Sequence, residues 1–556
     1  MKLLERFCLI AGLATALLAV SSFAQAPLQI GITNGNATVS WPNSESLNSL
    51  QTTTSLSPPV QWSGAGSVYY GFGSVNFPMT NSQQFFRLEQ SWPVFAFDIF
   101  YNLNLEIDPG NLTPINGPVF CNQSIWAGSP YVSFVSTVAA AGNIYYLATN
   151  GISTDPWCSG KTDSGTPIAN FSYPPAVHQL SLNLPIVNGS SAVSAEAMIN
   201  LVTNGMGAPN SQAYTTNGQF FLFNECDLII SNSATGLAGT RGTNITIWFQ
   251  DIAQASPLTP ITEDFYALKT GGSTNVLNNY SGIDSPTNVL SASYSFATNV
   301  QFYDYRESDT VQAVQIDVSK LNVWLTNAAE TGGQQYNQMS YMDKGRGICS
   351  VFIYNNVPLT VSQLPAVRLV NGQQLPCTTD PSGSGPTTDG LTVVTPQPLY
   401  IKGNYNVQTA SSSAGASAGT TNTAYTYPAS LMGDAITILA GSWSDGYTSS
   451  TSLSSRTPTT TTINAAVLEG IVQSANSNYS GGVENFLRLE ENWSNVTLQY
   501  NGSIVVMFAS QYATNFWPGT GTIYNAPTRK WAFDLNFTDP AKLPPLTPFV
   551  VNYVSP

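Results

Sequence analysis

The sequence predicts a mainly β protein: a small N-terminal β-sandwich, then a parallel β-helix-like (solenoid) body with an inserted α+β lobe. Three observations favour this fold. Charged residues form only 9% of the 556 residues, against roughly 25% in an average soluble domain, a composition that suits long β-structures outside the cytoplasm. Short alternating apolar runs, punctuated by Gly and Asn, recur about every ten residues, as in the coils of a β-helix. Hydrophobic residues, at 42%, supply a packed core and exclude global disorder.

Residues 1–26 have the pattern of a secretory signal peptide. Lys2 and Arg6 stand at the start, an apolar stretch runs from Phe7 to Val20, and Ala24-Gln25-Ala26 fits a cleavage site. A transmembrane helix needs ~20 apolar residues, so this stretch is too short to span a bilayer. No later segment approaches 18 uninterrupted apolar residues. We therefore expect a mature chain that is exported, to the periplasm, the cell surface or the medium, and has no membrane span.

Residues 27–92 predict the small β-sandwich. The alternating run Ala37–Trp41 and the run Gln83–Leu88 read as strands, with turn residues between the strands of the module. We expect Trp41 and Trp62 to lie in the core of this module. A platform for stacking sugars is the alternative use of the two rings.

The β-helix-like body is expected in two parts, residues 93–150 and residues 346–556, the latter including a C-terminal tail. Residues 391–405 and 498–508 carry the clearest strand-and-corner rhythm. The Asn501-Gly502 step fits either a tight antiparallel hairpin or a solenoid corner, so it leaves the topology open.

Residues 151–345 interrupt this rhythm and predict the inserted lobe. Strands are expected at 219–223 and 243–249. A packed helix is expected at residues 318–325, because Val318, Leu321, Trp324 and Leu325 fall on one helical face.

The formal net charge of −14 and the absence of any basic run exclude sequence-independent binding of nucleic acids or of anionic lipids. The charges that are present gather in four segments, 302–309, 343–346, 484–491 and 529–534. The proposed coils are nearly neutral. A specific function is therefore to be sought in these segments.

The cysteines predict no zinc site, since no Cys-x-x-Cys pair is present and His178 is the single histidine. Five cysteines remain after signal cleavage, and buried inert thiols or disulfides both fit them. Cys349 with Cys377 is the candidate disulfide, because this bridge would close a loop that ends in a Pro/Ser/Gly-rich stretch.

Paired carboxylates are the best enzymatic possibility, because glycosidic cleavage needs two acids at a fixed separation. The candidates are Asp304, Glu307, Glu484 and Glu490. The alternative is structural: Glu484 and Arg488 would form an ion pair on a short packed helix that extends to Trp493. No nucleophile elbow accompanies His178. The sequence therefore assigns no catalytic residue, no cofactor and no metal.

Segments 481–488, 501–505 and 527–545 resemble large exported bacterial proteins of unassigned function, some of them similar to X-type accessory proteins of type IV pilus assembly. Residues 391–405 fit the same pattern. Residues 27–90 resemble a small β-module of bacterial surface proteins. The resemblance implies a surface or envelope location and carries over no catalytic residues.

These observations predict an exported, non-enzymatic protein of the cell surface or envelope, with an adhesion, matrix or pilus-related role. Its partners would be surface polysaccharide or other envelope and appendage proteins. The alternative is a carbohydrate-active β-helix enzyme, a glycoside hydrolase or lyase. Its mark would be a groove with two or more acids, or acids with Lys or Arg, lined by Trp or Tyr.

Overall fold

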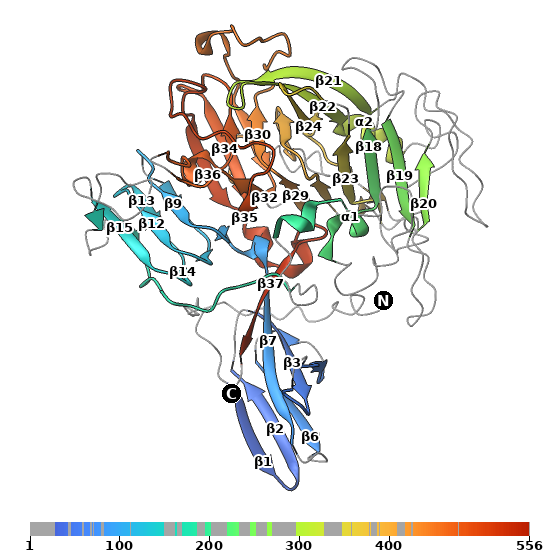
Figure 1. Cartoon of the computed structure of the whole chain (residues 1–556), viewed down its shortest axis with the longest axis vertical. Helices are drawn as coiled ribbons and strands as arrows, with labels where there is room; N and C mark the ends of the chain where they lie inside the picture. Colours follow the sequence, from blue (N-terminus) through green and yellow to red (C-terminus); the bar gives the residue numbers. More distant parts are fainter. Residues whose placement is uncertain are drawn as a thin grey trace.

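The computed structural model describes most of residues 28–148 and 347–554, together with 162–163, 169–185, 195–201, 220–232, 245–251, 264–268 and 296–326. In this part of the chain the protein is mainly β with parallel sheets, as predicted (Figure 1). Its α-helices there are α1 (Leu222–Glu225) and α2 (Val318–Thr326). The signal peptide expected at residues 1–26 lies outside the described residues.

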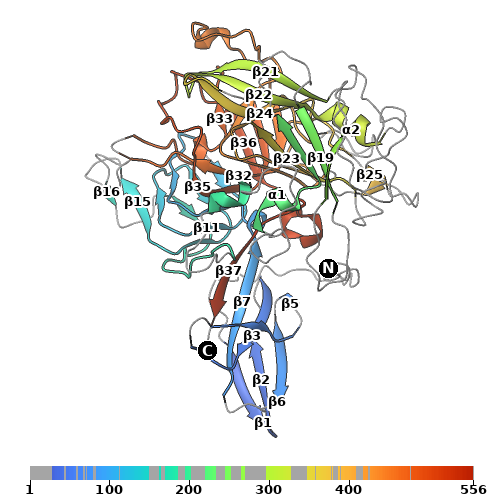
Figure 2. The same ribbon diagram turned by 45° about the vertical axis from the view of Figure 1, so that its right-hand side comes forward.

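A small module projects from the larger body in both views (Figure 1, Figure 2). Its two sheets are antiparallel and share one hydrophobic core, in which Trp41 is 1% exposed. The first sheet has the order β1 (Gln29–Thr33), β2 (Asn36–Trp41), β6 (Gly73–Pro78). The second has the order β37 (Phe549–Val554), β7 (Phe85–Pro93), β3 (Leu47–Thr53), β4 (Ser63–Gly64), with β5 (Tyr69–Tyr70) also paired to β3.

Strand β37 lies in this module and not with the tail of the body, where the sequence placed it. It pairs antiparallel with β7, so that Val551 stands opposite Ser91. The guanidinium of Arg87 lies over the rings of Trp62 and of Tyr553, which belongs to β37. Residues from both ends of the described chain therefore build the module together.

The longest sheet of the body has eleven strands, parallel from β14 to β18 and antiparallel from there to β20. In spatial order its strands are β14 (Val138–Ala140), β11 (Val119–Cys121), β8 (Ile99–Tyr101), β35 (Ile504–Ala509), β32 (Ala466–Ile471), β29 (Ala429–Gly433), β27 (Leu391–Val394), β23 (Ser350–Asn355), β18 (Leu228–Asn232), β19 (Ile245–Asp251) and β20 (Asp264–Leu268).

Beside the long sheet run a second and a third row of strands, each divided into two sheets. The second row has β16 (Thr162–Asp163), β15 (Ile144–Ala148), β12 (Ile125–Ala127), β9 (Leu105–Ile107), and separately β21 (Ala297–Asp304), β22 (Asp309–Asp317), β24 (Gln363–Val370), β28 (Leu399–Lys402), β30 (Ile436–Leu439), β33 (Arg488–Leu489). The third row has β10 (Thr113–Ile115), β13 (Val132–Phe134), β17 (Asn170–Phe171), and separately β31 (Thr461–Asn464), β34 (Thr497–Gly502), β36 (Thr528–Phe533). The short pair β25 (Thr378–Thr379) and β26 (Pro386–Thr387) stands apart.

From β8 to β15 the chain adds a strand to the long sheet, the second row and the third row in turn, and it does so again from β29 to β34. Ile99 aligns with Val119, and Val119 with Val138, in the long sheet. Between the rows lies a core of Ile, Leu and Val side chains. Buried asparagines also stack from one pass to the next: Asn501 Nδ2 donates to Asn464 Oδ1 at 2.6 Å. Such stacking satisfies polar groups that would otherwise be costly to bury.

The two parts of the body meet where β8 pairs in parallel with β35. The Asn102 N–H donates to the carbonyl of Val506 at 2.7 Å, and the Ser503 hydroxyl donates to that of Phe97 at 2.6 Å. The chain thus enters the body at β8, an interior strand of the long sheet, and later returns to pair β35 with that same strand.

In the third row the two parts do not pair with each other. The backbone groups of Thr113 and Ile115 hydrogen-bond to β13. The backbone groups of successive residues in a strand point to opposite sides, so those of Pro114 face β36. Proline has no N–H to donate, and it occurs at unpaired sheet edges for that reason. The junction is therefore closed in the long sheet and open between β10 and β36.

Two local predictions were wrong and two were confirmed, one of which is the strand expected at 243–249, found as β19 (Ile245–Asp251). Residues 222–225 are helical where a strand was expected at 219–223. The short helix expected from Glu484 is a single 3-10 turn, η6 (Val483–Asn485), followed by β33. The helix expected at 318–325 is α2, with Val318, Leu321 and Leu325 buried.

The Asn501-Gly502 step is a corner between β34 and β35, not a hairpin, since both strands pair only in parallel. A Cβ added at Gly502 would overlap the carbonyl oxygen of Ala465. We expect Gly502→Ala to destabilise the protein by about 1–3 kcal/mol, the usual range for overpacking, measured as a shift of the urea midpoint. The matched control is Gly110→Ala, because a Cβ added at Gly110 meets no other atom. This variant should leave the urea midpoint nearly unchanged.

Candidate functional site

Three of the four candidate carboxylates meet in one buried network around Arg488. Arg488 Nη1 lies 2.7 Å from Glu307 Oε1, and its Nη2 donates to the carbonyl of Ala513 at 2.6 Å. Asp304 accepts from the Glu307 N–H at 2.7 Å and from the Tyr400 hydroxyl at 2.5 Å. The carboxylates of this network therefore brace the loop after β21 against β28 and β33.

Glu490 holds the same loop from another side. Its Oε2 accepts from the Tyr305 N–H at 2.7 Å, and its Oε1 from the Arg306 N–H at 3.4 Å. The ion pair expected between Glu484 and Arg488 does not form, because the chain after η6 is extended and the two residues do not share a helical face.

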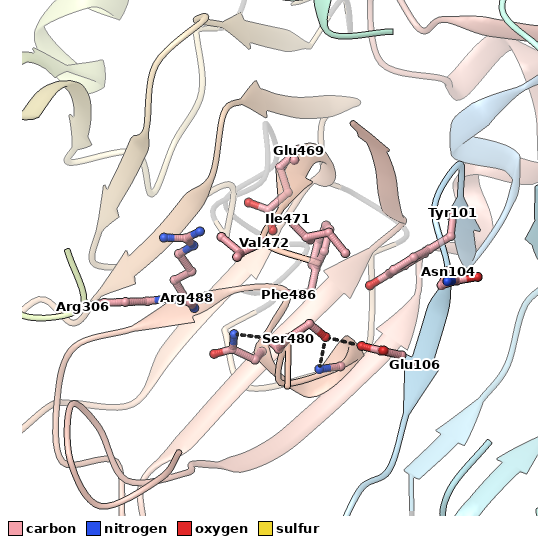
Figure 3. Close-up of a pocket in the computed structure, with 13 residues that line it drawn as sticks. Tyr101, Asn104, Glu106, Arg306, Glu469, Ile471, Val472, Ser480, Phe486 and Arg488 are labelled. Carbon is pink, nitrogen blue, oxygen red and sulfur yellow. Dashed lines mark hydrogen bonds between the residues drawn. The ribbon is translucent and has the colours of Figure 1, made fainter. Parts of the chain in front are cut away.

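A small cavity adjoins this network, shown in Figure 3. Arg306 and Arg488 lie on one side of it, Glu106 and Tyr101 on the other, and Glu469 above. Glu106 is held by the hydroxyl of Ser480. The volume of the cavity is about 10 Å³, which leaves room for about one water molecule. It cannot admit a substrate.

Burial shifts the protonation of the groups around this cavity. Burial raises the pKa of Glu469 well above its usual value, against the opposing effect of Arg488. Burial also raises the pKa of Glu490, and the neighbouring Asp304 raises it further. Burial lowers the pKa of Arg306 to about 9, with Arg488 adding to the effect. Because these groups are enclosed and the cavity has room for about one water, we interpret them as a structural polar core.

The fourth candidate, Glu484, lies elsewhere, in an open cleft at the gap between β10 and β36. The volume of the cleft is about 720 Å³, which is within the range of ligand-binding sites in proteins. It is lined by residues 109–111 and 113–115 from one part of the body and by residues 526–529, 531 and 532 from the other. Asp98, Glu484 and Tyr500 also line it.

Two carboxyl groups in this cleft have pKa values near neutrality. Burial raises the pKa of Asp98 to about 7, although the backbone N–H groups of Gly117 and Asn116 lower it. Burial raises the pKa of Glu484 to about 7 as well, opposed by its backbone hydrogen bonds and by Arg529. The Asp98 side chain accepts from the Gly117 N–H at 2.8 Å, and Glu484 accepts from the Asp108 N–H at 2.9 Å.

An aromatic and a cationic side chain from β36 complete the cleft. Trp531 is partly exposed and its ring centre lies 5.8 Å from that of Tyr500. Arg529 donates to the main-chain carbonyl of Glu484 at 2.7 Å, and its guanidinium lies 5.6 Å from the centre of the Trp531 ring. The cleft thus combines two acids, one arginine and two aromatic rings.

The sequence singled out Glu484 but missed Asp98, Arg529 and Trp531 as site residues. The clustering of charge at 484–491 and 529–534 pointed to the segments that carry Glu484, Arg529 and Trp531, whereas no sequence signal pointed to Asp98. His178 lies exposed, away from both the cavity and the cleft.

The candidate disulfide stays a prediction, because Cys377 lies outside the described residues. Cys349 is buried, and its N–H donates to Asp227 Oδ2 at 2.9 Å. No helix among the described residues is long and apolar enough to cross a membrane.

No protein-family model matches the chain, and no curated protein or solved structure is significantly similar to it.

Proposed function

We propose that this is an exported, non-enzymatic protein of the bacterial cell surface or envelope, with a parallel β-helix body carried on a small β-sandwich module. The proposal rests on where three of the four candidate acids lie and what they contact. Asp304, Glu307 and Glu490 are committed to hydrogen bonds and an ion pair inside the body. None of the three lines the open cleft.

The strand pairing supports a β-helix. From β8 to β15 and from β29 to β34 the chain adds strands to the three rows in turn, and the neighbouring strands in these segments pair in parallel. Passes of this kind bury a face that no single pass can bury alone. A stacked body of this type presents a large, nearly neutral surface, which suits contact with envelope polymers or appendage proteins.

The resemblance to pilus-accessory proteins supports the same role and adds a location. An appendage-related protein must leave the cytoplasm, and residues 1–26 have the pattern that directs export.

Export is tested by expressing the full chain in a Gram-negative host and measuring the mass of the protein recovered outside the cytoplasm. We expect a mature chain without residues 1–26. A matched variant, Ala24→Asp with Ala26→Asp, should accumulate uncleaved. Recovery of the intact chain in the cytoplasm, with no processed form, would contradict the proposal.

A second candidate is a carbohydrate-active enzyme. The observation that favours it is the cleft, where Asp98 and Glu484 both have a pKa of about 7 beside Trp531. Carboxyl groups with near-neutral pKa values can act as general acids. Release of reducing sugar from polysaccharides by the purified protein, lost in Asp98→Asn and Glu484→Gln, would favour the enzyme over the binding protein.

A further inference from the structure

We propose that the cleft between β10 and β36 is a binding site for a largely uncharged oligosaccharide segment of a polysaccharide chain. The inference rests on the proposed function, for which it names the ligand class and the site.

The cleft is a built feature of the fold. The long sheet runs without a break through β8 and β35, and the same junction is interrupted in the third row at Pro114. Rigid parallel strands on both sides hold its walls. A preformed concave site of this kind loses little conformational entropy when a ligand enters.

The aromatic side chains supply the apolar part of the recognition. Trp531 is partly exposed at the wall of the cleft, and Tyr500 packs against its ring at an angle of 71°. Large rigid rings provide a large contact area and lose little conformational entropy on binding. A pyranose ring has apolar C–H faces that match such a surface, whereas its hydroxyl groups need polar partners.

The polar partners are present in the same cleft. Asp98 and Glu484 offer carboxyl oxygens, Arg529 offers N–H groups, and Asn111 and Asn495 offer amides. Arg529 Nε and Trp531 Nε1 have no hydrogen-bond partner among the described residues. Both nitrogens are buried, so the polar contacts to a ligand would come from the carboxyl and amide groups and from the other N–H groups of Arg529.

The charge in the cleft selects an uncharged ligand. The cleft contains one guanidinium and two carboxyl groups whose pKa values lie near 7. Near neutral pH the site then carries little net charge, and no cluster of basic groups is present to hold a polyanion. A sugar chain of neutral residues meets these conditions better than a polyuronate or a nucleic acid.

The test is calorimetric titration of the full mature chain with three probes: cellohexaose, chitohexaose and a hexamer of galacturonate. We expect a neutral hexasaccharide to bind, and we expect Trp531→Ala and Glu484→Gln each to weaken that binding at least about tenfold, a loss of about 1.4 kcal/mol. Lys530→Ala is the matched control: it changes an exposed side chain of the same strand that does not line the cleft, and it should bind like wild type.

A second measurement keeps the proposal testable if Trp531→Ala unfolds. Addition of the bound hexasaccharide to wild type should slow amide exchange in residues 526–532 and leave the small module unchanged. The proposal is overturned if neither neutral probe binds, if the galacturonate hexamer binds best, or if Trp531→Ala and Glu484→Gln bind like wild type. Cleavage of a bound probe would support the cleft as the site while contradicting a non-enzymatic function, so the two failures are distinguishable.

Discussion

Replacement of Arg488 by methionine is expected to lower the free energy of unfolding by about 3–5 kcal/mol, the usual loss when one partner of a buried ion pair is removed. Arg488 is 5% exposed and pairs with Glu307 inside the body. Burial alone would lower the pKa of Arg488, but the carboxylates of Glu307, Glu469 and Asp434 raise it above its usual value. Its positive charge is thus held by several buried acids, which the variant leaves without their cation.

The measurement is urea unfolding followed by tryptophan fluorescence. Arg529→Met is the matched control, since Arg529 is partly exposed and bonds to one main-chain carbonyl. It should shift the free energy of unfolding by no more than about 1 kcal/mol. Equal stability of Arg488→Met and wild type would show that the network does not brace the body.

Raising the pH from about 5 to about 8 is expected to lower the thermal unfolding temperature by roughly 5 °C or more. Burial raises the pKa of Asp98, Glu484 and Glu491 to about 7 in each case. In the unfolded chain such groups titrate near 4. Between pH 4 and 7 the folded protein keeps protons that the unfolded chain has released, so stability is full below pH 4 and falls as the pH rises toward 7.

This dependence is checked by differential scanning calorimetry at constant ionic strength. Glu491→Gln removes one of the three groups while leaving an oxygen that can accept from the Ala440 N–H. It should flatten the pH profile and stabilise the protein most at pH 8. An unfolding temperature that rises with pH over this interval would contradict the assignment of Asp98, Glu484 and Glu491 as buried acids.

Local patterns in the sequence predicted the local structure well where periodicity was strong. The spacing of Val318, Leu321 and Leu325 identified α2, and the alternating runs identified a mainly β chain. The pattern failed at residues 484–493, where apolar spacing suited a helix but the backbone extends to pair β33 with β30. There a tertiary strand pairing outweighed the local preference.

The candidate site was only half accessible to sequence reasoning. Asp98, Glu484 and Trp531 meet because β8 joins β35, and a single sequence contains no signal for a pairing between strands so far apart. The buried network was equally hidden, since Arg488 finds its partner in Glu307 rather than four residues away. Charge clustering marked the segments that carry Glu484, Arg488 and Arg529, but it did not mark Asp98.

The closure of the chain on itself has a consequence for the order of folding. Asn102 contacts Met507 across 405 positions, and β7 needs β37 to complete its sheet. The first contact cannot form until β35 has been synthesised and the second pairing until β37 has been, and contacts of such long range slow folding. The body and the small module are consequently completed only by the last strands of the described chain, so neither can close while the chain is still being made.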